Sequence, residues 1–153
     1  MTHLKANRTR IATCCLAAAM LAAIGACTEV DSESIVPHFS AITCEPQHPA
    51  PGDSVTLTAV QDQVGHLINA TTYTWELTYT QPTMADTTVT ISNHIVYDLE
   101  GGNANPQVGF RIPADTPGRY LHVTLRATYS LSGQDRNGAI YGSATRSTDI
   151  VIQ

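Results

Sequence analysis

The stretch Leu121-His122-Val123-Thr124-Leu125-Arg126-Ala127-Thr128-Tyr129 alternates apolar and polar side chains without a break. Tyr73-Thr74-Trp75-Glu76-Leu77-Thr78-Tyr79 repeats that alternation earlier in the chain. A period of two is typical of a β-strand that buries one face and leaves the other in water. β-Branched and aromatic residues, which suit a pleated surface, recur in both stretches. The two stretches therefore predict antiparallel sheet rather than helix.

Shorter alternating runs lie on either side, at residues 55–59, 89–99, 108–112 and 140–152. Turn residues separate the runs, among them Pro51-Gly52 and the hairpin signal Asn137-Gly138. A chain of 153 residues suffices for one ordinary domain. About seven strands without an amphipathic helix predict an all-β fold, a single immunoglobulin-like β-sandwich over residues 37–153.

The N-terminus has the layout of a secretory signal. Residues 1–10 are polar and basic, and residues 11–26 are almost wholly apolar or small. The apolar run is shorter than the roughly 20 residues of a typical membrane-spanning helix. We therefore expect residues 1–26 to be a signal helix that is removed from the mature chain.

Ile24-Gly25-Ala26-Cys27, at the end of the apolar run, resembles the lipobox of bacterial lipoproteins. The resemblance implies cleavage before Cys27 and lipid on its thiol, with Ile24 standing where leucine is commoner. Two or more acyl chains anchor a protein stably, since each buried methylene contributes about 0.8 kcal/mol. The alternative is an ordinary cleaved signal with an incidental cysteine.

The residues after Cys27 are polar and acidic, which predicts a flexible tether over residues 27–36. Thr28, where aspartate is the usual cue for inner-membrane retention, suggests the outer membrane. The acidic residues through Glu33 resemble the surface-export signals of Bacteroidetes lipoproteins. We therefore expect a protein lipid-anchored in the outer membrane and exposed at the cell surface, although the sequence leaves the periplasmic face open.

Charge and cysteine content limit the partners. From Cys27 onward, five arginines and 13 acidic residues leave a net charge of −8, with no lysine. Such a surface repels phosphate backbones, so we expect no nucleic-acid partner. With Cys14 and Cys15 in the signal and Cys27 lipidated, Cys44 has no disulfide partner. We expect it to act as a small apolar strand residue rather than as a reactive thiol.

Three segments together resemble the PKD and immunoglobulin-like modules of bacterial surface proteins, especially those of Bacteroidetes lipoproteins. They are Pro51-Gly52-Asp53-Ser54-Val55-Thr56-Leu57-Thr58-Ala59, Tyr73-Thr74-Trp75, and Pro117-Gly118-Arg119-Tyr120 leading into the run at 121–129. The resemblance implies that Trp75 is the central core tryptophan and Tyr120 a core tyrosine corner. Tyr120 is out of phase with Leu121, so either a bulge intervenes or its side chain faces outward. Glu76-Leu77-Thr78 replaces the acidic, glycine-containing segment of PKD modules, so no function of that segment carries over.

Candidate sites for chemistry are few. The histidines show no close metal-ligand spacing, and no nucleophile, P-loop or dinucleotide motif occurs. Asp98, Glu100 and Asn103, beside Gly101-Gly102, offer hard oxygens that suit calcium but match no EF-hand; the alternative is a solvated acidic hairpin. We therefore expect neither an enzyme nor a cofactor.

Tyr141 and Arg136, near the Asn137-Gly138 turn, form a candidate binding patch, because both residue types favour interfaces. Ordinary surface or edge-strand filling is the alternative. The leading functional hypothesis is a non-catalytic binding or adhesion module for a glycan or protein ligand, or an accessory to glycan uptake. The second is a structural spacer or assembly subunit. Exposed aromatics at one loop end would favour glycans, whereas a long uncharged edge strand would favour assembly by strand addition.

Overall fold

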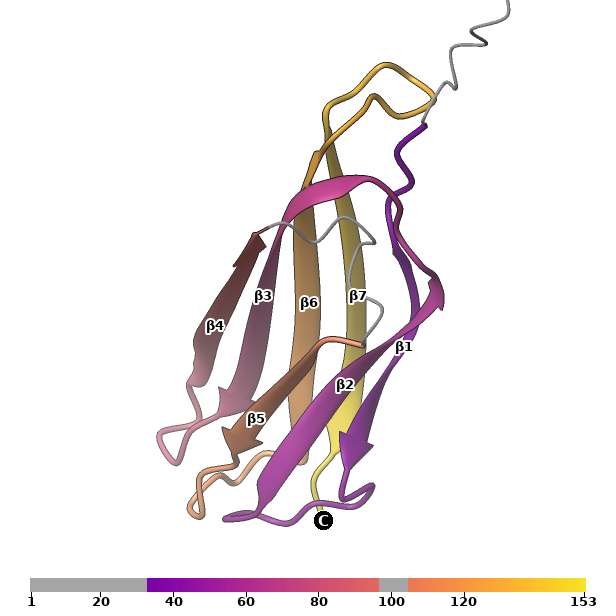
Figure 1. The fold of residues 1–153 in the computed structure, drawn as a ribbon. Helices are drawn as coiled ribbons and strands as arrows, with labels where there is room; N and C mark the ends of the chain where they lie inside the picture. The colour runs from indigo at the N-terminus through magenta and orange to yellow at the C-terminus, as the bar shows by residue number, and fades with distance from the viewer. Residues whose placement is uncertain (1–32, 97–104) are drawn as a thin grey trace, which may run out of the picture. The chain divides into compact units, whose positions relative to one another are not determined.

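Seven strands build the structure, a computed structural model that describes residues 33–96 and 105–153 (Figure 1). The strands are β1 (His38–Glu45), β2 (Ser54–Gln63), β3 (Ile68–Thr80), β4 (Asp86–Val96), β5 (Gln107–Arg111), β6 (Tyr120–Leu131) and β7 (Tyr141–Val151). No helix occurs among the described residues. The predicted all-β fold is confirmed, while the expected signal helix lies outside the described residues.

The strands form two antiparallel sheets, one with the order β1-β2-β5 and one with the order β4-β3-β6-β7 (Figure 1). The β2–β3, β4–β5 and β5–β6 connections each lead from one sheet to the other. β4 pairs beside β3, as an added C′ strand does in immunoglobulin domains. The result is an immunoglobulin-like sandwich with β4 and β7 at the edges of the larger sheet.

Alternating side chains from both sheets meet in one core, as the period of two predicts. Trp75 is only 2% exposed, which confirms its expected place in the core. Between the sheets, the rings of Tyr79 in β3 and Phe110 in β5 lie 5.9 Å apart at a tilt of 44°. Buried side chains of the central strands include Val55, Leu57, Ala59, Tyr73, Leu77, Leu121, Val123, Leu125, Ala127 and Tyr129. Burial of these apolar faces is what holds the sheets together.

Tyr120 is not part of the core, so that expectation is wrong. Its side chain is 58% exposed, whereas Leu121 is fully buried. β6 pairs with β7 in unbroken register from Tyr120 onward, so no bulge re-aims the side chain inward. In a regular strand, neighbours point to opposite faces, which places Tyr120 on the outer face.

The segment expected to be a tether is ordered against the sandwich at its C-terminal end. Ser34 is 3% exposed, and Ile35 forms a β-bridge with His66. Residues 34 and 35, which were assigned to the tether, therefore contact the domain expected to begin at residue 37. Residues 1–32, including the lipobox and Cys27, lie outside the described residues. The described residues hold no helical segment with the length and hydropathy that crossing a bilayer requires.

Candidate functional site

The N-terminal segment 33–36, here called the N-terminal clasp, ties together two loops at one end of the sandwich. Ser34 N donates to Gln134 O (3.1 Å), and Ser34 Oγ donates to Leu67 O (3.2 Å). The same hydroxyl oxygen accepts from Gly133 N (3.1 Å). The hydroxyl of this buried serine therefore donates one hydrogen bond and accepts another, and it links the 64–67 and 132–140 loops.

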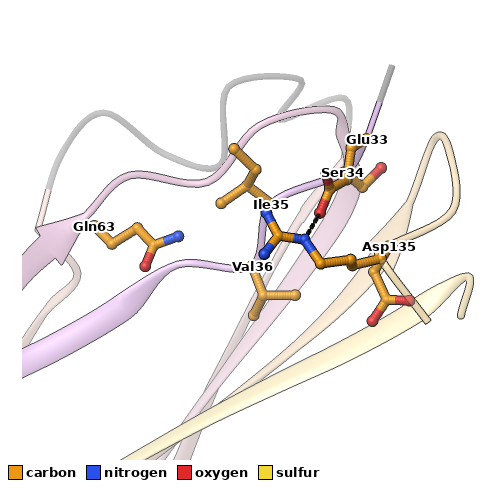
Figure 2. A pocket seen from close by; sticks show the side chains of 7 residues that line it. Glu33, Ser34, Ile35, Val36, Gln63 and Asp135 are labelled. Carbon is orange, nitrogen blue, oxygen red and sulfur yellow. Dashed lines mark hydrogen bonds and ion pairs between the residues drawn. The ribbon is translucent and has the colours of Figure 1, made fainter. Parts of the chain in front are cut away.

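Beside the clasp lies a depression of about 330 Å³, lined by Glu33, Ser34, Ile35, Val36, Gln63, Asp135 and Arg136 (Figure 2). Arg136 Nε donates to Glu33 Oε1 over 2.9 Å, so the guanidinium is already paired with a carboxylate. Asp135 Oδ1 accepts from the backbone N–H groups of Asn137 and Ala139, and these bonds hold the pKa of Asp135 below its ordinary value. The charged groups of this depression therefore serve the local structure.

The two residues of the expected binding patch have different surroundings. Arg136 contacts the N-terminal clasp, whereas Tyr141 is 69% exposed at the start of β7. By strand alternation, Tyr141 projects from the outer face of the larger sheet, as does Tyr120. The two tyrosines lie at opposite ends of that face, because Tyr120 pairs with Val151 while Tyr141 pairs with Ser130. About ten residue steps separate them, roughly 30 Å.

Between the two tyrosines, the outer face of the larger sheet carries a field of threonine and serine side chains, here called the hydroxyl face. Its members are Thr88, Thr90 and Ser92 of β4, Thr72, Thr74, Thr78 and Thr80 of β3, Thr124 and Thr128 of β6, and Ser143, Thr145 and Ser147 of β7. Hydroxyls on neighbouring strands bond to one another, as in the pairs Thr78–Thr88 (2.8 Å) and Thr124–Ser147 (2.9 Å). Each hydroxyl can both donate and accept, so the face retains capacity for a polar ligand.

Charged side chains on the hydroxyl face also pair within the face. Arg126 Nε lies 3.5 Å from Glu76 Oε2, and His122 Nδ1 lies 2.6 Å from Asp149 Oδ1. Thr80 Oγ1 donates to Asp86 Oδ1 over 3.1 Å. The face therefore presents hydroxyls and tyrosines rather than a strong charge of one sign.

The sequence predicts no metal site other than the calcium candidate. Asp98, Glu100 and Asn103 lie outside the described residues. Nearby Asn105 uses Oδ1 to accept from Gln61 N (2.9 Å). Within residues 33–96 and 105–153, no three His, Cys, Asp or Glu side chains come together as a metal-binding group.

Cys44 lies in β1, half-buried against the core, as a free thiol. Burial raises the pKa of this thiol, and the negative charge of Glu45 adds to the rise. A raised pKa leaves less of the nucleophilic thiolate at neutral pH. The surroundings thus fit the expected role as a small strand residue.

The fold places the described residues in the class of all-β immunoglobulin-like sandwiches. Comparisons with known proteins do not assign the chain to a family within that class. No protein-family model and no curated protein matches the chain. Among solved structures, the chain is similar to Spo0M, a sporulation control protein from Bacillus subtilis, with 16% identity and a TM-score of 0.36. The match covers 74% of this chain and 48% of that one, so the chain spans about half its length. A likeness this distant carries no functional argument.

The sequence did not reveal the hydroxyl face as a site. Alternating threonines were visible in each strand, but the order of the strands was not. Only the order β4-β3-β6-β7 places four polar strand faces side by side. A signal was present in the sequence, since Thr72, Thr74 and Thr78 share one parity with Glu76.

Proposed function

We propose that this chain is a non-catalytic cell-envelope lipoprotein whose sandwich binds an extended glycan along the hydroxyl face. The hydroxyl face, with an exposed tyrosine at each end, is the observation that carries the proposal. Sugar hydroxyls require partners that both donate and accept, which threonine and serine provide. Tyrosine rings add apolar contact area with a polar tip.

Charge and spacing narrow the ligand further. The net charge of −8 from Cys27 onward disfavours strongly anionic polymers. Tyr120 and Tyr141 do not gather at one loop end, so a short oligosaccharide cannot contact both. A ligand that touches both must extend for roughly 30 Å. A neutral polysaccharide chain fits these requirements.

Lipid attachment at Cys27 would orient the domain. Six residue steps from Cys27 to Glu33 span at most about 20 Å. The end that carries the N-terminal clasp and the 132–140 loop would then lie near the membrane. Tyr141 would sit toward the bilayer, and the 46–53, 81–85 and 112–119 loops at the opposite end would point away from it (Figure 1).

Binding of the full chain to a panel of neutral polysaccharides tests the proposal. A Thr74→Val/Thr128→Val variant removes two hydroxyls of the face while keeping the side-chain shapes. Each lost hydrogen bond contributes about 0.5–1.5 kcal/mol, so we expect roughly fivefold to a hundredfold weaker binding. Thr43→Val/Thr56→Val, on exposed positions of the smaller sheet, is the matched control and should bind as the parent does. No binding by the parent, or equal loss in both variants, would contradict the proposal.

The anchor is tested separately by fractionation of cells that express a Cys27→Ala variant. We expect the parent in the membrane fraction and the variant in the soluble fraction. Protease treatment of intact cells then distinguishes surface display from a periplasmic position. Membrane retention of the variant would contradict lipidation at Cys27.

The second candidate function, an assembly subunit of an envelope complex, is favoured by the β4 edge. β4 has eleven residues, and among them only Asp86 carries a formal charge at neutral pH with histidine neutral. Within the described residues it pairs with β3 alone. Its outer backbone edge is therefore available for strand addition.

A further inference from the structure

The four edge strands of the sandwich differ in how well they are protected against pairing with another chain. β1 has two register shifts near His38 and Phe39, and β5 has only five residues. β7 carries Arg146 and Asp149, and β1 packs beside it. Bulges, short length, charge and coverage are the usual devices against edge-to-edge pairing.

Among the described residues, β4 has no bulge and no covering strand, it is long, and its one formal charge is Asp86 at its first position. It pairs with β3 over eleven residues without a register shift and contains no proline. Its inward-facing side chains are incompletely covered, since Ile91 is half-buried and Ile95 is 37% exposed. A long, regular, weakly charged edge with partly exposed apolar groups is suited to accept another strand.

The sequence of β4 is complementary to itself in one antiparallel register. With a two-fold axis through Thr90, residues of equal parity face each other, so the hydroxyl face continues across the junction. In this register Val89 lies opposite Ile91 of the second copy, and Thr88 lies opposite Ser92. Asp86 lies opposite His94, which places a carboxylate acceptor beside an imidazole donor at each end of the pairing.

The Asp86–His94 pair distinguishes this register from its neighbours. Moving the axis by one residue separates these two side chains. In the single copy, Nδ1 of His94 lies 2.7 Å from Thr72 Oγ1, so Nε2 is the ring atom left to meet the carboxylate. Both members of the pair are exposed on the same face as Thr90.

We infer that β4 pairs antiparallel with β4 of a second copy of this chain, about a two-fold axis at Thr90. The two larger sheets then form one continuous sheet of eight strands, with the two hydroxyl faces joined on one side. This inference deepens the assembly function, rests on it, and is independent of glycan binding.

Sedimentation equilibrium of the full chain in detergent tests the pairing. Thr90→Lys places two ammonium groups opposite each other at the axis, and like charges so placed disfavour association. In the single copy the new charge lies opposite Glu76, so the fold is not penalised. We expect a dimer for the parent and at least about tenfold weaker association for the variant. Thr56→Lys is the matched control, since Thr56 is also exposed and lies opposite an acidic residue, Glu45.

Complementary charges at the axis provide the converse test. Thr90→Glu lies opposite Glu76 in the single copy, so its fold is first compared with that of the parent by circular dichroism. Once folded, Thr90→Glu alone should also weaken the dimer, whereas an equimolar mixture of Thr90→Lys and Thr90→Glu chains should form a heterodimer. For the register, Asp86→Lys and His94→Asp should each weaken association, and the double variant should restore it.

A parent that remains monomeric at all concentrations, or a Thr90→Lys variant that dimerises as the parent does, overturns the inference. Cross-linking that places a strand of a different protein on β4 also overturns it. Polysaccharide binding by a parent that stays monomeric would refute the pairing alone. Loss of binding in Thr74→Val/Thr128→Val dimers would concern the glycan proposal alone.

Discussion

Position 142 requires glycine, because its backbone lies close to the side chain of Val36. A β-carbon built on Gly142 would lie 2.4 Å from Val36 Cγ2, nearer than real side chains approach. Val36 is the last residue of the N-terminal clasp and packs against the core. Glycine at the second position of β7 therefore lets the N-terminal clasp pack against the sheet.

We expect Gly142→Ala to lower the free energy of unfolding by about 1–3 kcal/mol, because Val36 must move to admit the methyl group. Urea unfolding measures the change. Gly109→Ala is the control, since a β-carbon there meets nothing within 4 Å. Equal stability of the two variants would contradict the close packing of Val36.

The stability of the 132–140 loop depends on pH through the carboxyl group of Asp135. Backbone N–H bonds from Ala139 and Asn137 lower the pKa of its carboxyl below the ordinary value of 3.8. The folded state thus favours the carboxylate more than the unfolded chain does. This stabilisation is fully present above the unfolded pKa and is lost as pH falls through the folded pKa.

We therefore expect an NMR titration of the Asp135 carboxyl carbon to show a midpoint below that of the unfolded chain. Unfolding measured between pH 5 and about pH 2 should show a smaller loss of stability in Asp135→Asn than in the parent. A midpoint at the ordinary aspartate value would contradict the stabilisation of the carboxylate by the backbone N–H groups of Ala139 and Asn137.

At the scale of elements, the N-terminal clasp joins two loops that are distant in sequence. Ser34→Ala removes the acceptor of Gly133 N and the donor to Leu67 O. We expect a loss of about 1–3 kcal/mol, because the partly buried backbone N–H of Gly133 is left without its partner. Ser143→Ala, on the exposed outer face of β7, is the control and should change stability by less than about 0.5 kcal/mol.

Hydrogen exchange adds a local readout of the same element. In Ser34→Ala, amide protection should fall first at His66 and Gly133, whose backbone bonds depend on the docked segment. Unchanged protection at both amides would show that the N-terminal clasp does not hold these loops.

At the scale of the whole molecule, Trp75 reports on the joint packing of both sheets. It is the single tryptophan of the chain and is 2% exposed. We expect its fluorescence and the far-UV circular dichroism to change at the same urea concentration, since one shared core unfolds as a unit. Trp75→Ala should cost about 3–5 kcal/mol. Separate transitions for the two signals would contradict a single cooperative core.

The sequence by itself determined the strands and their buried faces. Alternation at a period of two identified Trp75 and Leu125 as core residues, and both are buried. This works because burial on a strand is a local property of residue parity. The same alternation puts Tyr120 out of phase with Leu121, whereas the family resemblance implied a place in the core. Regular pairing of β6 with β7 keeps the Tyr120 side chain on the outer face.

Only the tertiary structure decided which strands are neighbours and which are edges. The hydroxyl face exists because β4, β3, β6 and β7 lie side by side, and β4 is open because no described strand pairs beyond it. The docking of Ser34 likewise depends on loops about 33 and 99 residues away in the chain. Such pairings depend on contacts between distant segments, which local residue patterns do not encode.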